Sequence, residues 1–179
     1  ELREQGVIDA VGVGMNQSAM LTEFVRRTDV DLVMCANRYT LLEQPAARDL
    51  LPLAAERGVA VVVAGVFNSG LLAQHRVADD ATYEYAQAPA EVIAHARELA
   101  DLAAQHGVTL PDLAVQYPLR HPAVRSVALG MRTAEQVRSN AARMGARIPE
   151  AAWEDVERTG PDAASGGDTP PGGSTDDTR

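Results

Sequence analysis

Small and amide-bearing residues recur at the ends of four apolar segments of the chain. They lie where each segment gives way to a loop, and they are Asn16, Asn37, Phe67-Asn68-Ser69 and Gly130-Met131-Arg132-Thr133. Small residues let a ligand approach the backbone closely, and N–H groups at the start of a following helix attract anions. In parallel α/β folds, binding sites form at the carboxyl ends of strands. The pattern therefore predicts a site for an anionic ligand at this end of a sheet.

Other common binding and catalytic motifs are missing from the sequence. The segment "GVGMNQ" has two of the three glycines of a dinucleotide loop, but Gln17 stands in the third place. All 16 basic residues are arginine, so any phosphate loop or mechanism that needs a lysine is closed to this chain. No Cys or His pair has the spacing of metal ligands, and we expect no metal site.

The polar groups follow four nearly continuous apolar runs, which predict buried strands at 7–14, 31–39, 59–65 and 124–130. Helical patterns are found between and after these runs, at 18–28, 46–58, 88–107, 110–122, 133–145 and 149–160. Strand and helix thus alternate four times along the chain. This order predicts an α/β fold with parallel strands and right-handed crossovers.

Composition limits the possible partners. The formal net charge of −9 argues against nucleic acid and against an anionic membrane surface. No apolar run is long enough to span a bilayer, and the single cysteine, Cys35, fits a reducing cytoplasm. Residues 160–179 are rich in Gly, Pro, Ser, Thr and Asp, so we expect a disordered tail after a domain at 1–159.

Four blocks of the sequence resemble the aldo-keto reductases. They are "VIDAVGVGMNQSAML", "DLVMCANRYTLLEQ", "GVAVVVAGVFNSGLL" and "LAVQYPLRHPAVRSVALGMRTAEQVRSN", which look like the fifth to eighth strands of that family with their exits. The resemblance covers residues 1–159. "YTLLEQ" and "FNSGLL" are most similar to the group of D-threo-aldose, L-fucose and L-galactose dehydrogenases.

This resemblance implies the C-terminal half of a (β/α)8 TIM barrel, the half that binds NAD or NADP. Carried over residue by residue, Phe67, Asn68 and Ser69 would wrap the pyrophosphate. Gly130, Met131, Arg132 and Thr133 would run beside the adenosine ribose, and Gln136 and Asn140 would face the adenine. Asn16 and Asn37 would hold the nicotinamide carboxamide, although the family often has Ser-Asn where Gly14-Met15 stand here.

The family's catalytic Asp, Tyr, Lys and His belong to the other half of the barrel, which nothing here matches. We therefore expect this chain alone to be inactive, and the complete parent to transfer hydride between the nicotinamide cofactor and a small carbonyl or sugar substrate. NADP-preferring members usually carry two basic residues at the positions of Gly130 and Gln136. Both are neutral here and only Arg132 lies near, so the sequence favours NAD.

Two other interpretations remain open. Four parallel strands leave two open edges, so the chain could be a non-catalytic half-barrel that binds or assembles with another chain, or self-associates. A flavodoxin-like sheet that binds a phosphate ligand is the other. In a half-barrel we expect Val11, Val13, Val33 and Val61 to face inward and lack an opposite wall.

Overall fold

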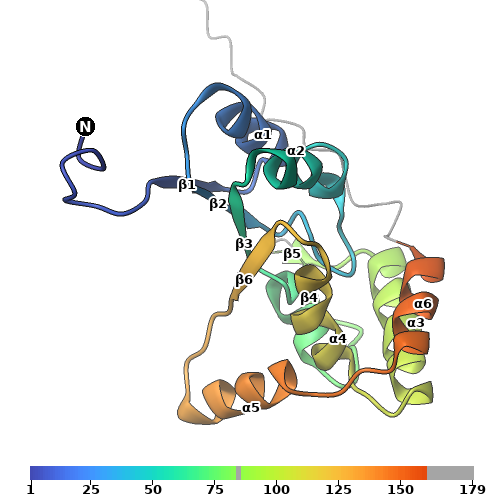
Figure 1. Ribbon diagram of the computed structural model, residues 1–179. Helices are drawn as coiled ribbons and strands as arrows, with labels where there is room; N and C mark the ends of the chain where they lie inside the picture. Colours follow the sequence, from blue (N-terminus) through green and yellow to red (C-terminus); the bar gives the residue numbers. More distant parts are fainter. Residues whose placement is uncertain (84–85, 161–179) are drawn as a thin grey trace, which may run out of the picture.

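A computed structural model describes residues 1–83 and 86–160 (Figure 1). The tail predicted at 160–179 therefore lies outside the described residues, except for Gly160. Four strands form one parallel sheet in the order β1-β2-β3-β6. They are β1 (Gly12–Met15), β2 (Leu32–Ala36), β3 (Ala60–Ala64) and β6 (Val124–Ala128). The predicted α/β fold with about four parallel strands and intervening helices is confirmed.

Within the described residues, six α-helices and three short 3-10 segments follow or connect the strands. The helices are α1 (Ser18–Arg27), α2 (Leu50–Arg57), α3 (Ala90–Gln105), α4 (Leu110–Gln116), α5 (Ala134–Met144) and α6 (Glu150–Thr159), and the 3-10 segments are η1 (Pro45–Ala47), η2 (Asn68–Ala73) and η3 (Tyr117–Arg120). All six predicted helices are present. The prediction missed a small antiparallel pair, β4 (Thr82–Tyr83) and β5 (Ala86–Gln87).

Two strands are shorter than the sequence predicted, because of hydrogen bonding and backbone conformation at one end of each strand. The first starts at Gly12 rather than residue 7, because the Val11 N–H donates to the Asp31 carboxylate at 2.7 Å and not to a neighbouring strand. That hydrogen bond, together with Arg3, lowers the pKa of Asp31. The second strand ends at Ala36, since Asn37 turns into the left-handed region with φ 63°. A left-handed residue cannot continue a strand.

Side chains alternate across the sheet, and one face carries most of the core. Val33 and Val61, together with Cys35 and Val63, are fully buried and belong to the main hydrophobic cluster that the helices complete. The prediction that Val33 and Val61 face an open barrel interior was therefore wrong. Neighbouring positions of a strand point to opposite faces of the sheet, and these two valines lie on the face that the helices cover. Met34, which lies between two of these positions and is 40% exposed, points to the opposite face.

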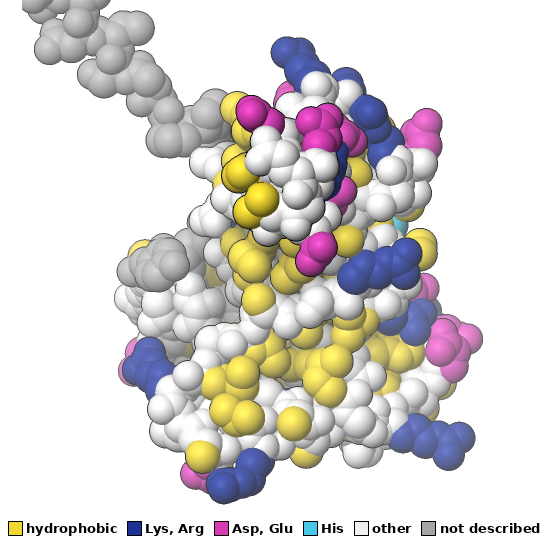
Figure 2. All heavy atoms as spheres, turned by 60° about the vertical axis from the view of Figure 1, so that its left-hand side comes forward, with side chains coloured by type: hydrophobic (Ala, Val, Ile, Leu, Met, Phe, Trp, Pro, Cys, Tyr) yellow, Lys and Arg dark blue, Asp and Glu magenta, His cyan; other side chains and the backbone are white. Residues whose placement is uncertain are grey.

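The face that bears Met34 and the two outer strands stay open in the described part of the chain. Both β1 and β6 pair on one side only. Figure 2, viewed from the side of β1 and the N-terminal segment, shows hydrophobic side chains gathered across the middle and lower part of the molecule. Helix α5 buries only Asn140, while Val137 and Met144 are 49% and 41% exposed. No helix among the described residues is long and apolar enough to span a membrane.

Candidate functional site

A cavity of about 830 Å³ lies at the carboxyl ends of β2, β3 and β6. Its lining includes seven of the residues that the sequence singled out, namely Asn37, Phe67, Asn68, Ser69, Gly130, Arg132 and Gln136. The volume is within the range of small-molecule and cofactor pockets. Three loops that are distant in sequence thus meet at one place, because parallel strands present their carboxyl ends at one edge of the sheet.

The other four predicted residues lie elsewhere. Met131 and Asn140 line a smaller groove of about 350 Å³ between β6 and α5, and the Asn140 Oδ1 accepts a hydrogen bond from Arg143 at 2.8 Å. Thr133 is the N-cap of α5, and its hydroxyl accepts the Gln136 N–H. Asn16 follows β1, the outermost strand on the side away from the cavity, and is not part of its lining.

The floor of the cavity contains an unusual run of left-handed backbone. Asn68, Ser69 and Gly70 have φ values of 44°, 59° and 96°, and Gly65 and Asn37 have values of 71° and 63°. Asparagine and glycine tolerate this region better than other residues do. The resulting turn breaks the 3-10 segment η2 at its start and keeps the chain close to the cavity.

Gly65 is fixed by a second constraint besides its positive φ. A Cβ atom at this position would lie 1.9 Å from the Asn37 Oδ1 and 2.9 Å from its Cγ. The Asn37 side chain therefore lies directly against the Gly65 backbone. These two residues, from the exits of neighbouring strands, shape the cavity together.

The start of α5 closes the third side of the cavity. The Arg132 N–H donates to the Gln136 Oε1 at 2.6 Å, while the Gln136 N–H donates to the Thr133 hydroxyl at 3.2 Å. This reciprocal arrangement satisfies backbone donors at the helix N-terminus. The Arg132 guanidinium forms no ion pair within the described residues, and it brings a positive charge to the cavity.

A buried carboxylate beneath the cavity was missed by sequence reasoning. Glu43 is 1% exposed and accepts hydrogen bonds from the Tyr83 hydroxyl at 2.7 Å and the Asn68 Nδ2 at 3.1 Å, while Arg38 forms an ion pair with it. The only signal in the sequence was a charged residue directly after the apolar "YTLL".

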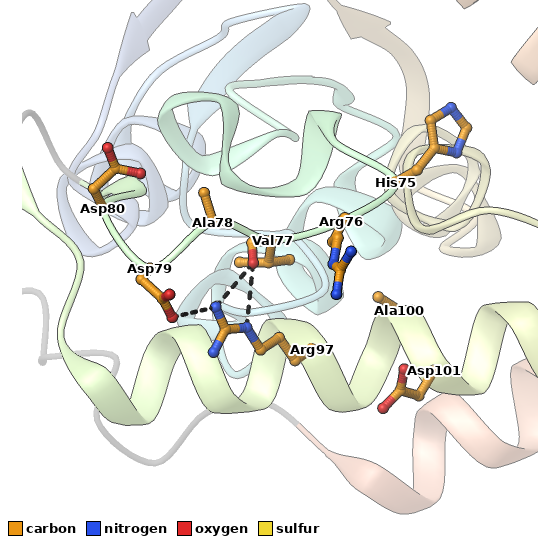
Figure 3. Close-up of a pocket in the computed structure, with 9 residues that line it drawn as sticks. All are labelled: His75, Arg76, Val77, Ala78, Asp79, Asp80, Arg97, Ala100 and Asp101. Atoms are coloured by element: carbon orange, nitrogen blue, oxygen red, sulfur yellow. Dashed lines mark hydrogen bonds and ion pairs between the residues drawn. The ribbon is translucent and has the colours of Figure 1, made fainter.

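A second cavity, of about 920 Å³, lies between the loop at 75–80 and α3 (Figure 3). Arg97 donates two hydrogen bonds to the Val77 carbonyl and one to Asp79, and this guanidinium lowers the pKa of the Asp79 carboxyl. The Arg97 guanidinium thus holds the loop at 75–80 to helix α3. This cavity contains none of the predicted site residues.

The sequence profile of the aldo/keto reductase family matches residues 1–160 of this chain. The chain belongs to the aldo/keto reductase family. Two curated members are similar to it: the D-threo-aldose 1-dehydrogenase of a Pseudomonas species, with 44% identity over 156 residues, and the pyridoxal 4-dehydrogenase of Microbacterium luteolum, with 41% identity over 160 residues. These alignments cover 87% and 89% of this chain, but 47% and 46% of the relatives.

Solved structures also match most of this chain with about half of their own length. An aldo-keto reductase of Bacillus halodurans in its holo form superposes with a TM-score of 0.71 at 24% identity, over 88% of this chain and 52% of that chain. The glycerol dehydrogenase of Gluconobacter oxydans superposes with a TM-score of 0.69 at 22% identity, over 88% and 50% of the two chains. The aldo/keto reductase chain described here thus spans about half the length of its relatives, and its sheet corresponds to half of their TIM barrel.

Proposed function

We propose that this chain is the dinucleotide-binding half of an NAD(P)-dependent dehydrogenase of aldoses or related small carbonyl compounds. The observation that carries the proposal is the cavity at the strand ends, where residues implied by the family resemblance meet around a left-handed turn. The names of the two curated relatives, an aldose and a pyridoxal dehydrogenase, support the substrate class.

The residues present fit a dinucleotide in shape and in charge. When bound, NAD(P) supplies or accepts the hydride of the reaction. The turn at 67–70 would hold the pyrophosphate close to the backbone, and Arg132 and Gln136 would hold the adenosine side. Asn37 would orient the nicotinamide carboxamide, with Asn16 as a second candidate that this cavity does not include. Met131, Thr133 and Asn140 would support the adenosine side through the start of α5.

The three tyrosines of the described residues are poorly suited to donate a proton to a substrate. Burial raises the pKa of both Tyr39 and Tyr117, whose rings pack 5.5 Å apart, whereas a proton-donating tyrosine needs a lowered pKa. The Tyr83 hydroxyl is committed to Glu43. We therefore propose that the chain binds the cofactor and does not turn over a substrate.

Calorimetric titration of the 179-residue chain with NAD⁺ and NADP⁺ tests the binding, and an assay with aldoses and either cofactor tests the inactivity. We expect saturable binding, tighter for NAD⁺, without turnover. Absence of binding for both nucleotides would refute the cofactor site. Turnover in the ordinary enzyme range of about 1 per second or more would refute the inactivity.

One observation favours a second role, as an assembly module. The unpaired edges of β1 and β6 and the exposed Met34 are the features of a sheet that pairs with another chain. Self-association through these edges is therefore a candidate property of the chain, and nucleic acid and membranes are not proposed partners. A cytoplasmic location is proposed from the buried Cys35, the sole cysteine of the sequence.

A further inference from the structure

Glu43 connects three segments that meet under the cavity. It belongs to the loop after β2, Asn68 to the loop after β3, and Tyr83 to β4. Its two carboxylate oxygens have different partners: Oε2 forms the ion pair with Arg38, and Oε1 accepts hydrogen bonds from both Asn68 and Tyr83. The loop itself is closed by hydrogen bonds between Thr40 and Glu43 backbone and side-chain atoms. Each buried oxygen of this carboxylate thus has a partner, as burial of a charge requires.

We propose that Glu43 is a positioning residue, which holds the turn at 67–70 in the conformation that binds the dinucleotide by fixing the side-chain amide of Asn68. The proposal rests on the proposed function. Glu43 itself is buried and lines no part of the cavity, so its effect is exerted through Asn68, which does.

The direction of the hydrogen bond determines how Asn68 is oriented. Because Glu43 is paired with Arg38, it is ionised and can only accept hydrogen bonds. The Asn68 Nδ2 must therefore face Glu43, and the Oδ1 must face away from it. The Asn68 Oδ1 is buried and has no donor among the described residues, so no competing bond fixes the amide the other way.

This anchor stabilises a backbone that would otherwise be strained. Asn68 and Ser69 both lie in the left-handed region, which is unfavourable for a residue with a Cβ atom. Asn68 is 3% exposed, so its amide cannot obtain the same hydrogen bonds from water. The Arg38 guanidinium also holds the Glu43 carboxylate in place through their ion pair.

Removal of the Glu43 charge in the full chain tests this role. Glu43→Gln replaces the charged acceptor of the Asn68 amide by a neutral one, and we expect it to weaken NAD⁺ binding by about threefold or more. Asp155→Asn is the matched control, since it likewise replaces a carboxylate by an amide, here at the contact between Asp155 on α6 and His106, outside the cavity lining. It should leave NAD⁺ affinity unchanged.

Hydrogen exchange of the backbone amides of 67–70 provides a readout that does not need the cofactor. Glu43→Gln keeps the size of the side chain, and we expect faster exchange of these amides than in the wild type or in Asp155→Asn. Wild-type NAD⁺ affinity in Glu43→Gln, or backbone exchange at 67–70 in Glu43→Gln that is as slow as in the wild type, would each overturn the positioning role. If the wild type binds neither NAD⁺ nor NADP⁺, the proposed function fails, whereas the exchange measurement still decides whether Glu43 holds the turn.

Discussion

Substitution of Gly65 by alanine separates the shape of the cavity from the stability of the chain. Gly65 has φ 71°, so a Cβ atom there costs about 1–2 kcal/mol of backbone strain. The same atom would lie 1.9 Å from the Asn37 Oδ1, which forces that side chain to another rotamer at about 0.5–1.5 kcal/mol. Gly107 is a matched control: its φ is 72°, and a Cβ atom there meets nothing within 4 Å.

We expect urea denaturation to show a loss of about 1–2 kcal/mol for Gly107→Ala, and about 1.5–3.5 kcal/mol for Gly65→Ala. Calorimetry should show weaker NAD⁺ binding for Gly65→Ala only, because the displaced Asn37 side chain lines the cavity. Adding Asn37→Gly to Gly65→Ala should recover the part of the stability that the clash removed, because glycine tolerates the φ of 63° at position 37. Equal stability losses for the two glycine variants, together with wild-type NAD⁺ affinity in Gly65→Ala, would refute the reasoning.

Three further outcomes are expected. Arg132→Ala should weaken NAD⁺ and NADP⁺ binding to a similar extent, by about threefold or more; a tenfold preference of the wild type for NADP⁺ that this variant loses would show that Arg132 binds a 2′-phosphate. Burial lowers the pKa of His121, and its Nδ1 accepts the Ala123 N–H, so the contribution of His121 to the free energy of unfolding is full above the ordinary pKa of 6.5 and is lost as pH drops through the folded-state pKa. His121→Asn should flatten this pH dependence in urea titrations from pH 7.5 to 5.5. An unchanged slope would contradict the prediction. Light scattering should detect association of the wild type. Met34→Glu, on the open sheet face, should reduce this association, whereas Met20→Glu, on helix α1, should not. Equal effects of the two variants would argue against association through the open sheet face.

The order of the elements and the gathering of the strand ends could be predicted, because both follow from hydrophobic pattern and parallel topology. The orientation of Val33 and Val61 could not, since an almost continuous apolar run contains no alternation that distinguishes the two faces. The prediction for Asn68 relied on the residue's place after a strand and could not include Glu43. That contact joins residues 25 positions apart, and only the fold brings their side chains together.

Asn16 and Asn140 show the opposite difficulty. Both were chosen by correspondence with a complete barrel. In this chain Asn16 follows an outer strand, while Asn140 is a buried residue of α5 whose side chain accepts a hydrogen bond from Arg143. The family resemblance gives a residue's position along the strand but does not determine which neighbours surround it. In contrast, Gly65 needed a structure to stand out, because its role depends on the rotamer of Asn37.

The strand order also has a kinetic consequence. In the sheet β1-β2-β3-β6 the first three strands are joined by connections of about 20 residues, whereas about 60 residues separate β3 from β6. Closing a loop costs about 0.6 kcal/mol more for each doubling of its length, so the last pairing carries an extra entropic cost of about 1 kcal/mol. Folding should therefore start among β1, β2 and β3, with β6 adding late. Because Gly130 and Arg132 follow β6, the cavity is completed only in the final stage of folding.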